Sequence, residues 1–373
     1  MIGVTYCLRL TIKSEDLEKD TQYLKRCAQL AMLGDGRVRD NPRVGSVLVH
    51  QDRIIGEGYH RIAGQGHAEV NCLASVRPED RKLIPESTLY ISLEPCCITG
   101  RSGACTDRIR REGIKTVVFA QRDPTPGVAG ESVQIMQRAD ITVREYPDFE
   151  ETKLPNAHRH TLVTLQRPYV VLKYASSADG FIRPADREAT YWITHPLSRR
   201  LVHRWRANTS AILVGGRTVV EDDPTLTTRL FHGPTPRPVI VDLRNRCTGK
   251  EKLFDGSGQQ PLVFASRARP ELAAEVVVLG KDLNKKALTQ VLGKLMEQRV
   301  GEVTVEGGAT LLNAFITTGL WDEARIFTGE ARFGNGLSAP RLSDDATLVE
   351  AKMVGTDRLE VFRNMVPEPG GAR

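Results

Sequence analysis

The sequence predicts an α/β protein built from two domains. The chain has 373 residues, of which 40% are apolar, and it is long enough for two hydrophobic cores because a domain typically holds about 100–200 residues. Helical patterns alternate with short apolar strand patterns in both halves, as in layered α/β folds. Between Asp148 and His160 this periodicity gives way to a charged segment that contains Pro155, and we expect the domain boundary there.

The first half alternates the two kinds of element in order along the chain. A helical pattern near Leu17–Leu33 is followed by a hairpin of strands 44–50 and 53–59, and then by a helix that contains His67. The remaining expected elements are strand 88–93, a helix after Cys105, strand 116–120, a helix from about Gly130 and strand 141–145.

The second half starts at Arg167-Pro168 with the buried-strand pattern Tyr169–Tyr174, which ends in a polar turn. The elements expected after it are helix 196–207, strands 211–214, 238–242 and 261–265, a helix around 285–298 and strand 302–306. We therefore divide the chain into an N-terminal extension (1–20), a first domain (21–147), a linker (148–167), a second domain (168–366) and a C-terminal tail (367–373).

Charge and composition narrow the function classes. The net charge of +6 comes from 52 basic and 46 acidic residues without a basic tract, which disfavours nucleic-acid binding and suits small anionic substrates. Seven cysteines without a paired framework indicate a reducing compartment. The N-terminal apolar run contains Arg9 and lacks a cleavage site, and no stretch approaches the length of a membrane span, so we expect a cytoplasmic protein without membrane contact.

The segment Gly66-His67-Ala68-Glu69-Val70, followed by Leu93-Glu94-Pro95-Cys96 and then Cys105, predicts a catalytic zinc site. One imidazole and two thiolates leave the fourth tetrahedral position for water, whereas a structural zinc site has four protein ligands. Glu69 is too close to His67 for both to bind one ion, but it is well placed to move a proton. This is the arrangement of zinc-dependent nucleobase deaminases.

Three thiols compete for the two cysteine positions, because Cys97 directly follows Cys96. We favour Cys96 and Cys105, since adjacent side chains diverge and a loop through Gly100 and Gly103 can turn the chain back. The alternative is an ordinary helix capped by His67, with the cysteines as small buried hydrophobic residues.

The second half carries two glycine pairs at strand ends, Gly215-Gly216 and Gly307-Gly308. The second pair leads into helix 311–318, so a pyrophosphate could rest on the helix N-terminus, although simple packing explains such a step equally well. The G-x-G-x-x-G fingerprint is absent, which disfavours an ordinary Rossmann domain. Arg206 and Arg229 are candidate phosphate clamps, or else surface arginines.

These residues resemble one family, the bifunctional riboflavin-biosynthesis deaminase/reductases, from about Tyr23 to Asn364. The motifs of the first half are Asn41-Pro42, Val44-Gly45, Gly56-Glu57-Gly58-Tyr59-His60, His67-Ala68-Glu69-Val70, Leu93-Glu94-Pro95-Cys96, Asp123-Pro124 and Val128-Ala129-Gly130. Those of the second half are Ala178-Asp179-Gly180, Trp192-Ile193-Thr194, His203-Arg204, Arg206-Ala207, Asp222-Asp223-Pro224, Leu226-Thr227 and Val305-Glu306-Gly307-Gly308.

The resemblance implies a cytidine-deaminase-like α/β/α domain followed by a dihydrofolate-reductase-like α/β domain. It implies zinc-dependent hydrolytic deamination of a diaminopyrimidinone ribosyl phosphate, with Glu69 as the proton shuttle and His67, Cys96 and Cys105 as the zinc ligands. NADPH would then reduce the ribosyl group to ribityl. The family also tends to form homo-oligomers through the reductase half.

Carried over by position, the resemblance implies two sets of contacts in the reductase. The NADPH contacts are Ala175, Trp192, Thr194, Thr218, Asp222, Gly308, Ala309, Thr310, Leu311, Leu312, Asn313 and Ala314. The substrate contacts are Thr190, Arg206, Leu226, Arg229 and Glu306, with the two arginines on the 5′-phosphate.

The chain also departs from the family pattern. Ile98 replaces a His near the deaminase substrate, Gly103-Ala104 replace two prolines, and Leu243 replaces a Ser that the family offers to the cofactor. One alternative is therefore a paralogue whose deaminase half acts on a related aminopyrimidine or has lost its activity. Another is a zinc-stabilised scaffold, but a purely structural site would gain nothing from Glu69.

Overall fold

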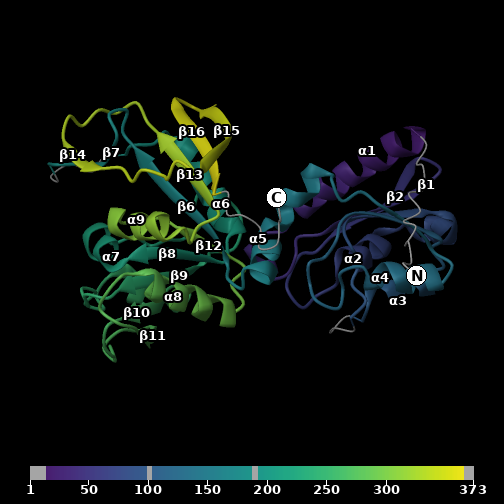
Figure 1. Ribbon diagram of the computed structural model, residues 1–373, viewed down its shortest axis with the longest axis horizontal. Helices are drawn as coiled ribbons and strands as arrows, with labels where there is room; N and C mark the ends of the chain where they lie inside the picture. Colours follow the sequence, from purple (N-terminus) through teal and green to yellow (C-terminus); the bar gives the residue numbers. More distant parts are fainter. Residues whose placement is uncertain (1–13, 99–102, 187–191, 365–373) are drawn as a thin grey trace, which may run out of the picture. The chain divides into compact units, whose positions relative to one another are not determined.

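The computed structural model describes residues 14–98, 103–186 and 192–364 (Figure 1). The chain forms two compact units. The first consists of Met1–Gly34 and Pro42–Ala157, and the second of Asp35–Asn41 and His158–Arg373. Within the three described ranges, none of the helices combines the length and the apolar character that crossing a membrane requires.

The first unit is built on a five-stranded sheet with the order β2-β1-β3-β4-β5. Strand β1 pairs antiparallel with β2 and β3, whereas β3, β4 and β5 run parallel. The strands are β1 (Gly45–His50), β2 (Arg53–Tyr59), β3 (Thr88–Leu93), β4 (Thr116–Gln121) and β5 (Thr142–Glu145). These bounds agree closely with the strand patterns of the sequence.

Helices cover both faces of this sheet, which gives the expected α/β/α layers (Figure 1). Because successive side chains of a strand point to opposite faces, Val47 packs with helix α1 and Leu48 with helix α2. The helices are α1 (Ser14–Ala31) on one face and α2 (Ala68–Ser75), α3 (Cys105–Arg111) and α4 (Glu131–Arg138) on the other.

The N-terminal extension expected at 1–20 differs from the structure, because α1 already begins at Ser14. Asp20 lies on the buried side of α1 with only 1% of its surface exposed. Its carboxylate accepts two hydrogen bonds from the guanidinium of Arg144, at 2.7 and 2.8 Å, and one each from the hydroxyls of Tyr90 (2.9 Å) and Tyr146 (2.6 Å). The carboxylate thus links α1 to β3, β5 and the segment after β5.

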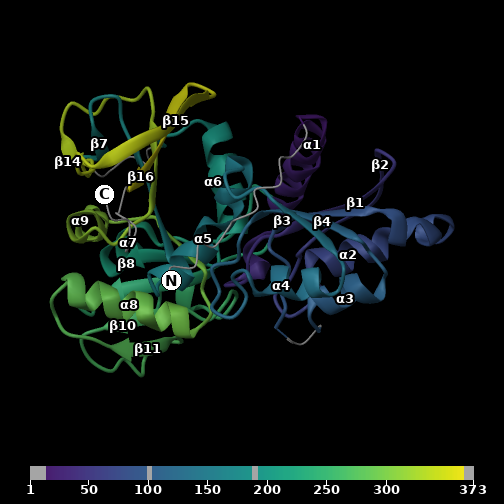
Figure 2. The same ribbon diagram turned by 45° about the vertical axis from the view of Figure 1, so that its right-hand side comes forward.

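The second unit is built on a nine-stranded sheet with the order β11-β10-β9-β8-β12-β6-β13-β16-β15. It is parallel from β11 to β13, and the antiparallel hairpin β15-β16 follows at the other edge (Figure 2). The strands are β6 (Tyr169–Ser176), β8 (Ala211–Gly215), β9 (Arg237–Asp242), β10 (Leu262–Ala265), β11 (Glu275–Val278), β12 (Glu302–Val305), β13 (Glu323–Thr328), β15 (Ala346–Val354) and β16 (Asp357–Asn364).

Two hydrophobic clusters occupy opposite faces of this sheet. Leu213 packs with helices α8 and α9 on one face, and its neighbour Ile212 packs against Val219 and Phe254 on the other. The helices of this unit are α6 (Pro196–Asn208), α7 (Gly216–Asp222), α8 (Lys285–Glu297) and α9 (Ala309–Thr318), and the short strands β7 (Phe181–Pro184) and β14 (Gly336–Ser338) form a separate pair.

The division between the units is not a single point in the sequence. The expected linker 148–167 contains the 3₁₀ turn η3 (Glu150–Thr152) and helix α5 (Lys153–Thr164), so it is not an irregular connection. The segment Asp35–Asn41, with the 3₁₀ turn η1 (Gly36–Val38), belongs to the second unit. There Arg39 donates to the carbonyl of Gln298 at 2.7 Å, and Arg299 donates to Asp40 at 3.0 Å.

We expect Asp20→Asn to destabilise the first unit selectively. Loss of the charge leaves the guanidinium of Arg144 without its counter-ion in a buried setting, at a cost of about 2–3 kcal/mol. Differential scanning calorimetry should show one transition lowered by roughly 5–10 °C and the other unchanged. Asp16→Asn is the control, because Asp16 is an exposed residue of the same helix. Equal shifts in both variants would contradict the role given to Asp20.

Candidate metal centre and dinucleotide cavity

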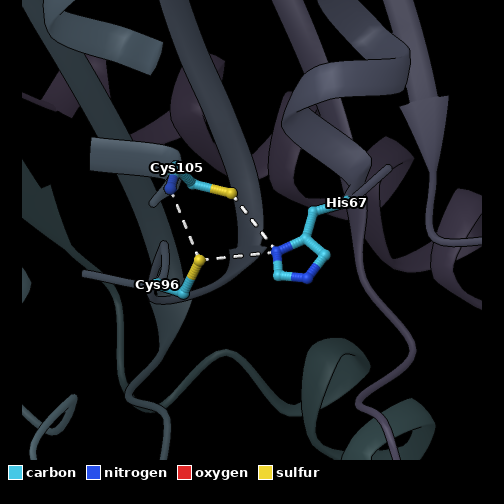
Figure 3. Close-up of side chains that lie close together, drawn as sticks. All are labelled: His67, Cys96 and Cys105. Atoms are coloured by element: carbon cyan, nitrogen blue, oxygen red, sulfur yellow. Dashed lines mark hydrogen bonds between the residues drawn. The ribbon is translucent and has the colours of Figure 1, made fainter. Parts of the chain in front are cut away.

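Three side chains of the first unit converge on one point (Figure 3). His67 immediately precedes α2, Cys96 lies in the turn after β3, and Cys105 is the first residue of α3. The Nδ1 atom of His67 is 3.4 Å from the sulfur of Cys96 and 3.3 Å from that of Cys105, and all three ligand atoms lie within 4.8 Å of one another. The structure therefore brings together the three expected metal ligands.

The competing thiol of Cys97 is directed elsewhere. Its sulfur donates a hydrogen bond to the carbonyl of Gly127 at 3.4 Å. Cys96, in contrast, accepts a hydrogen bond from the backbone N–H of Cys105 at 3.4 Å. Of the two adjacent cysteines, only Cys96 belongs to the cluster with His67.

The donor atoms fit zinc. One imidazole nitrogen and two sulfurs are the ligand set of a catalytic zinc site, and no fourth His, Cys, Asp or Glu within the described ranges joins the group. Hydrogen bonding from Cys105, and then from His67, lowers the pKa of Cys96 to about 4. This thiol therefore loses its proton readily, as a metal ligand must.

Two buried carboxyl groups lie on the segments that carry the ligands. Glu69 lies in the first turn of α2 with 3% of its surface exposed, and burial, followed by the charge of Cys96, raises its pKa. Glu94 accepts hydrogen bonds from the backbone N–H of Gly130 (2.9 Å) and the hydroxyl of Ser132 (2.5 Å), which fixes the start of α4 beside the Cys96 turn. In the sequence Glu94 stands only as a member of the Leu93-Glu94-Pro95-Cys96 motif, and its place directly after a buried strand is the signal that points to a role of its own.

The second unit contains a cavity of about 820 Å³ at the carboxyl ends of the parallel strands β6, β8, β9 and β12. Such a strand edge is the usual ligand site of an open α/β sheet. The expected residues that line it are Ala175, Trp192, Thr194, Thr218, Asp222, Glu306, Gly308, Ala309, Thr310, Leu311 and Leu312.

Several other expected contacts do not line the cavity. Asn313 is exposed, and Ala314 packs against the hydrophobic core, because only the first turn of α9 faces the cavity. Leu226 is buried, with 4% of its surface exposed. Thr190 lies outside the described residues. The cavity also includes residues that sequence reasoning missed, among them Lys173, whose pKa is lowered by burial beside Glu306.

The glycine pair at the end of β12 leaves room for a phosphate. Gly308 has a φ of 82°, which favours glycine, and a Cβ on Gly307 would come within 3.1 Å of the Thr218 side chain. Helix α9 begins directly afterwards. The N–H groups of Leu311 and Leu312 donate to the carbonyl of Gly308 at 3.0 and 3.1 Å, whereas the N–H groups of Ala309 and Thr310 have no carbonyl one turn earlier in the helix to bind. This site suits a pyrophosphate.

The guanidinium of Arg206 is held by Glu306 rather than left free. Two N–H groups donate to the carboxylate at 2.7 and 3.0 Å, and a third donates to the carbonyl of Thr227 at 3.1 Å. Burial raises the pKa of Glu306, but the charge of Arg206 outweighs it and holds the pKa below its usual value. Arg206 itself does not line the cavity, so the expectation of a free phosphate clamp differs from the structure.

Arg229, the second expected clamp, is tied to its own loop. Its backbone N–H donates to Nδ1 of His203 at 3.0 Å, and its guanidinium donates to the hydroxyls of Thr225 and Thr227. It does not line the cavity either.

Both units match known protein families. Residues 17–121 match the cytidine and deoxycytidylate deaminase zinc-binding region, and residues 168–361 match the RibD C-terminal domain. The riboflavin biosynthesis protein RibD of Aquifex aeolicus is 35% identical over 330 residues, which cover 86% of this chain and 90% of that protein. The Escherichia coli RibD is 31% identical over 333 residues, covering 85% of this chain and 89% of that protein.

Solved structures of RibD proteins are similar to this chain over most of its length. A Thermotoga maritima protein described as a diaminohydroxyphosphoribosylaminopyrimidine deaminase/5-amino-6-(5-phosphoribosylamino)uracil reductase is 34% identical, with a TM-score of 0.84 over 93% of this chain and 99% of that one. Acinetobacter baumannii RibD is 30% identical, with a TM-score of 0.82 over 94% and 100%. Matches in both halves do not favour a paralogue that has lost one of them. The chain therefore belongs to the RibD family of riboflavin biosynthesis proteins and joins a zinc-dependent deaminase to an NADPH-dependent reductase.

Proposed function

We propose that this chain carries out two successive reactions on one small molecule. The first unit deaminates a diaminopyrimidinone ribosyl phosphate, and the second reduces the ribosyl group of the resulting uracil to ribityl. The observation that carries the proposal is the presence in one chain of the His67, Cys96 and Cys105 cluster with a buried Glu69, and of a large cavity at the start of α9. The substrate follows the activities named for the Thermotoga maritima relative.

In the deaminase, His67, Cys96 and Cys105 would hold the zinc ion. Bound zinc lowers the pKa of water to about 7 and so supplies a nucleophile at neutral pH. Glu69 accepts the proton that the attacking water loses and returns it to the departing amino group, so that ammonia leaves. Its place in the first turn of α2, two residues after His67, keeps the carboxyl group fixed beside the ligand cluster.

In the reductase, bound NADPH would supply the hydride that forms the new C–H bond at C1′ of the ribose, while the bond from C1′ to the ring oxygen breaks and that oxygen takes a proton from solvent. The first turn of α9 would hold its pyrophosphate, and Ala175, Trp192 and Thr194 would lie at the nicotinamide end. Glu306 lines the cavity, so its carboxylate can accept hydrogen bonds from the sugar hydroxyls. Arg206 keeps that carboxylate ionised and oriented, which makes it a positioning residue. Thr190, Leu226 and Arg229 are the other predicted substrate contacts, of which Leu226 and Arg229 do not line the cavity.

We also infer a cytoplasmic homo-oligomer that associates through the second unit. Strand β15 is the edge of the nine-stranded sheet, and its Leu348, Val349 and Met353 are 46–61% exposed. An exposed apolar edge strand favours pairing with another chain. Its unpaired backbone groups and apolar side chains support self-association at this edge.

Glu69→Gln should abolish deamination and leave zinc binding intact. General acid–base catalysis contributes about 10²–10⁴-fold, so ammonia release should fall by at least that factor. The variant should still oxidise NADPH when it is given the deaminated substrate. Glu79→Gln, which alters an exposed carboxylate, is the control and should keep both activities. Normal ammonia release by Glu69→Gln would rule out its role as the proton shuttle.

Zinc content should distinguish the three neighbouring thiols. Cys96→Ser and Cys105→Ser each remove a soft ligand, and we expect them to lose most of their zinc on dialysis against a weak chelator. Cys97→Ser should retain one zinc per chain, because its thiol contacts Gly127 instead. Metal analysis by mass spectrometry makes the comparison, and zinc loss from Cys97→Ser alone would reverse the ligand assignment.

Arg206→Lys should impair only the reductase. A lysine keeps the charge but not the paired hydrogen bonds to Glu306, so kcat/KM for reduction should fall about 10–100-fold. Because Arg206 lowers the pKa of Glu306, the carboxylate of the variant should protonate at higher pH, and the acid limb of the reductase profile should move upward. Deamination should not change. Arg204→Lys, on the exposed side of the same helix, is the control, and an equal effect there would refute the role of the pair.

A further inference from the structure

The segment 192–195 borders the reductase cavity but belongs to no helix or strand. Its residues Trp192, Ile193 and Thr194 line the cavity together with Ala175 of β6. A segment of this kind lacks the repeating hydrogen bonds of a helix or a sheet, so its position depends on contacts with other elements. Those contacts come from the turn between β15 and β16, from helix α6 and from the residue after β13.

The turn between β15 and β16 contacts the end of this segment and the start of α6 (Figure 2). The backbone N–H of His195 donates to the carboxylate of Asp357 at 2.8 Å, and the hydroxyl of Ser198 donates to the carbonyl of Val354 at 3.2 Å. Gly355 has a φ of 63°, and a Cβ on it would overlap the imidazole ring of His195. The hairpin turn therefore packs directly on the last residue of the segment.

Asp357 is buried at the N-terminus of α6, with 1% of its surface exposed. His195 is the N-cap residue of this helix of 13 residues, and its Nδ1 accepts a hydrogen bond from the backbone N–H of Leu197 at 3.2 Å. The helix dipole favours negative charge at this end. The carboxylate of Asp357 thus makes two separable contributions, because its charge stabilises the helix and its oxygen holds the backbone of His195.

Two further contacts fix the beginning of the segment. The guanidinium of Arg199 lies over the ring of Trp192, 4.4 Å from the ring centroid, as in a cation–π contact. Gly329, directly after β13, passes so close to the carbonyl of Ile193 that a Cβ on it would overlap that oxygen. Trp192 is 64% exposed, so core packing does not hold its ring, and the contact with Arg199 orients it.

We propose that Asp357 and Arg199 are positioning residues of the reductase, which hold the segment 192–195 at the nicotinamide end of the cavity. The inference rests on the proposed reductase function, and neither residue lines the cavity itself. Hydride transfer depends steeply on the placement of the reacting carbons, so a displaced segment weakens cofactor binding and slows the reaction. The β15-β16 hairpin therefore contributes to reduction through the backbone of His195.

Steady-state kinetics of the zinc-loaded, full-length protein test the proposal. In Asp357→Ala and in Arg199→Ala, kcat/KM for reduction should fall about 10–100-fold, chiefly through a higher KM for NADPH. A smaller fraction of folded protein would instead lower kcat and leave KM unchanged. Asp357→Asn loses the charge but keeps an oxygen acceptor, so it should melt at a lower temperature and yet keep the KM for NADPH within about twofold. Deamination should not change in any of these variants.

Tryptophan fluorescence reports the position of the segment without turnover. Trp192 is exposed whereas Trp321 is fully buried. Each protein is compared with the same protein carrying Trp192→Phe, so the difference isolates the signal of Trp192. Acrylamide quenching of this signal should rise in Asp357→Ala and Arg199→Ala, because the ring leaves its contact, and should stay unchanged in Asp357→Asn.

Thr356→Ala and Arg200→Ala are the matched controls, because each alters an exposed neighbour in the same turn or helix, and both should keep the KM for NADPH. An unchanged KM in Asp357→Ala or in Arg199→Ala would overturn the role given to that residue. An equal rise in Asp357→Asn and Asp357→Ala would overturn the role of the hydrogen bond. If the unaltered protein neither binds nor oxidises NADPH, the reductase function fails and the inference with it, whereas normal oxidation with insensitive variants overturns the inference alone.

Discussion

Both candidate sites depend on the parallel direction of neighbouring strands, because it places the segments that follow those strands at one edge of the sheet. Every strand of a parallel sheet ends at the same edge, so the loops and helix N-termini that follow are brought together even when they are distant in sequence. In the first unit, β3 delivers Cys96 and the parallel pairing of β3 with β4 fixes that edge. In the second unit, β6, β8, β9 and β12 end around one cavity. Helix N-termini at these points favour thiolates in one site and phosphates in the other.

The buried carboxylates show how differently the two units use negative charge. Asp20 is neutralised by Arg144 and two tyrosine hydroxyls and serves the packing of α1. Glu306 is paired with Arg206 but also faces the cavity, where a sugar could reach it. Burial and the charge of Cys96 both raise the pKa of Glu69, so they disfavour its ionised form. The same side-chain chemistry thus gives a structural link, an oriented acceptor and a proton carrier, depending on its partners.

The sequence predicted what depends on local pattern. Strand 88–93 is a short apolar run with a cysteine turn after it, and the structure has the strand at those bounds. The edge hairpin β15-β16 was missed although both strands carry the signal, because apolar and polar residues alternate in Val349-Glu350-Ala351-Lys352-Met353 and in Arg358-Leu359-Glu360-Val361. The pair Arg206–Glu306 spans 100 residues and arises only from tertiary packing. For the same reason, the orientation of α9 that turns Asn313 and Ala314 away from the cavity could not be inferred from their position next to the glycine pair.

The two units cannot be separated by a single cut, because the first unit is discontinuous in the sequence. The segment Asp35–Asn41 leaves the first unit early, joins the second, and the chain then returns at Pro42 to complete the first. If the chain were divided near residue 150, this segment would stay on the deaminase fragment, although it belongs to the second unit. The reductase piece would lose the partners of Gln298 and Arg299, while the deaminase piece would keep an arginine and an aspartate with nothing to bind. To obtain two complete units, the segment Asp35–Asn41 must also be transferred to the reductase fragment.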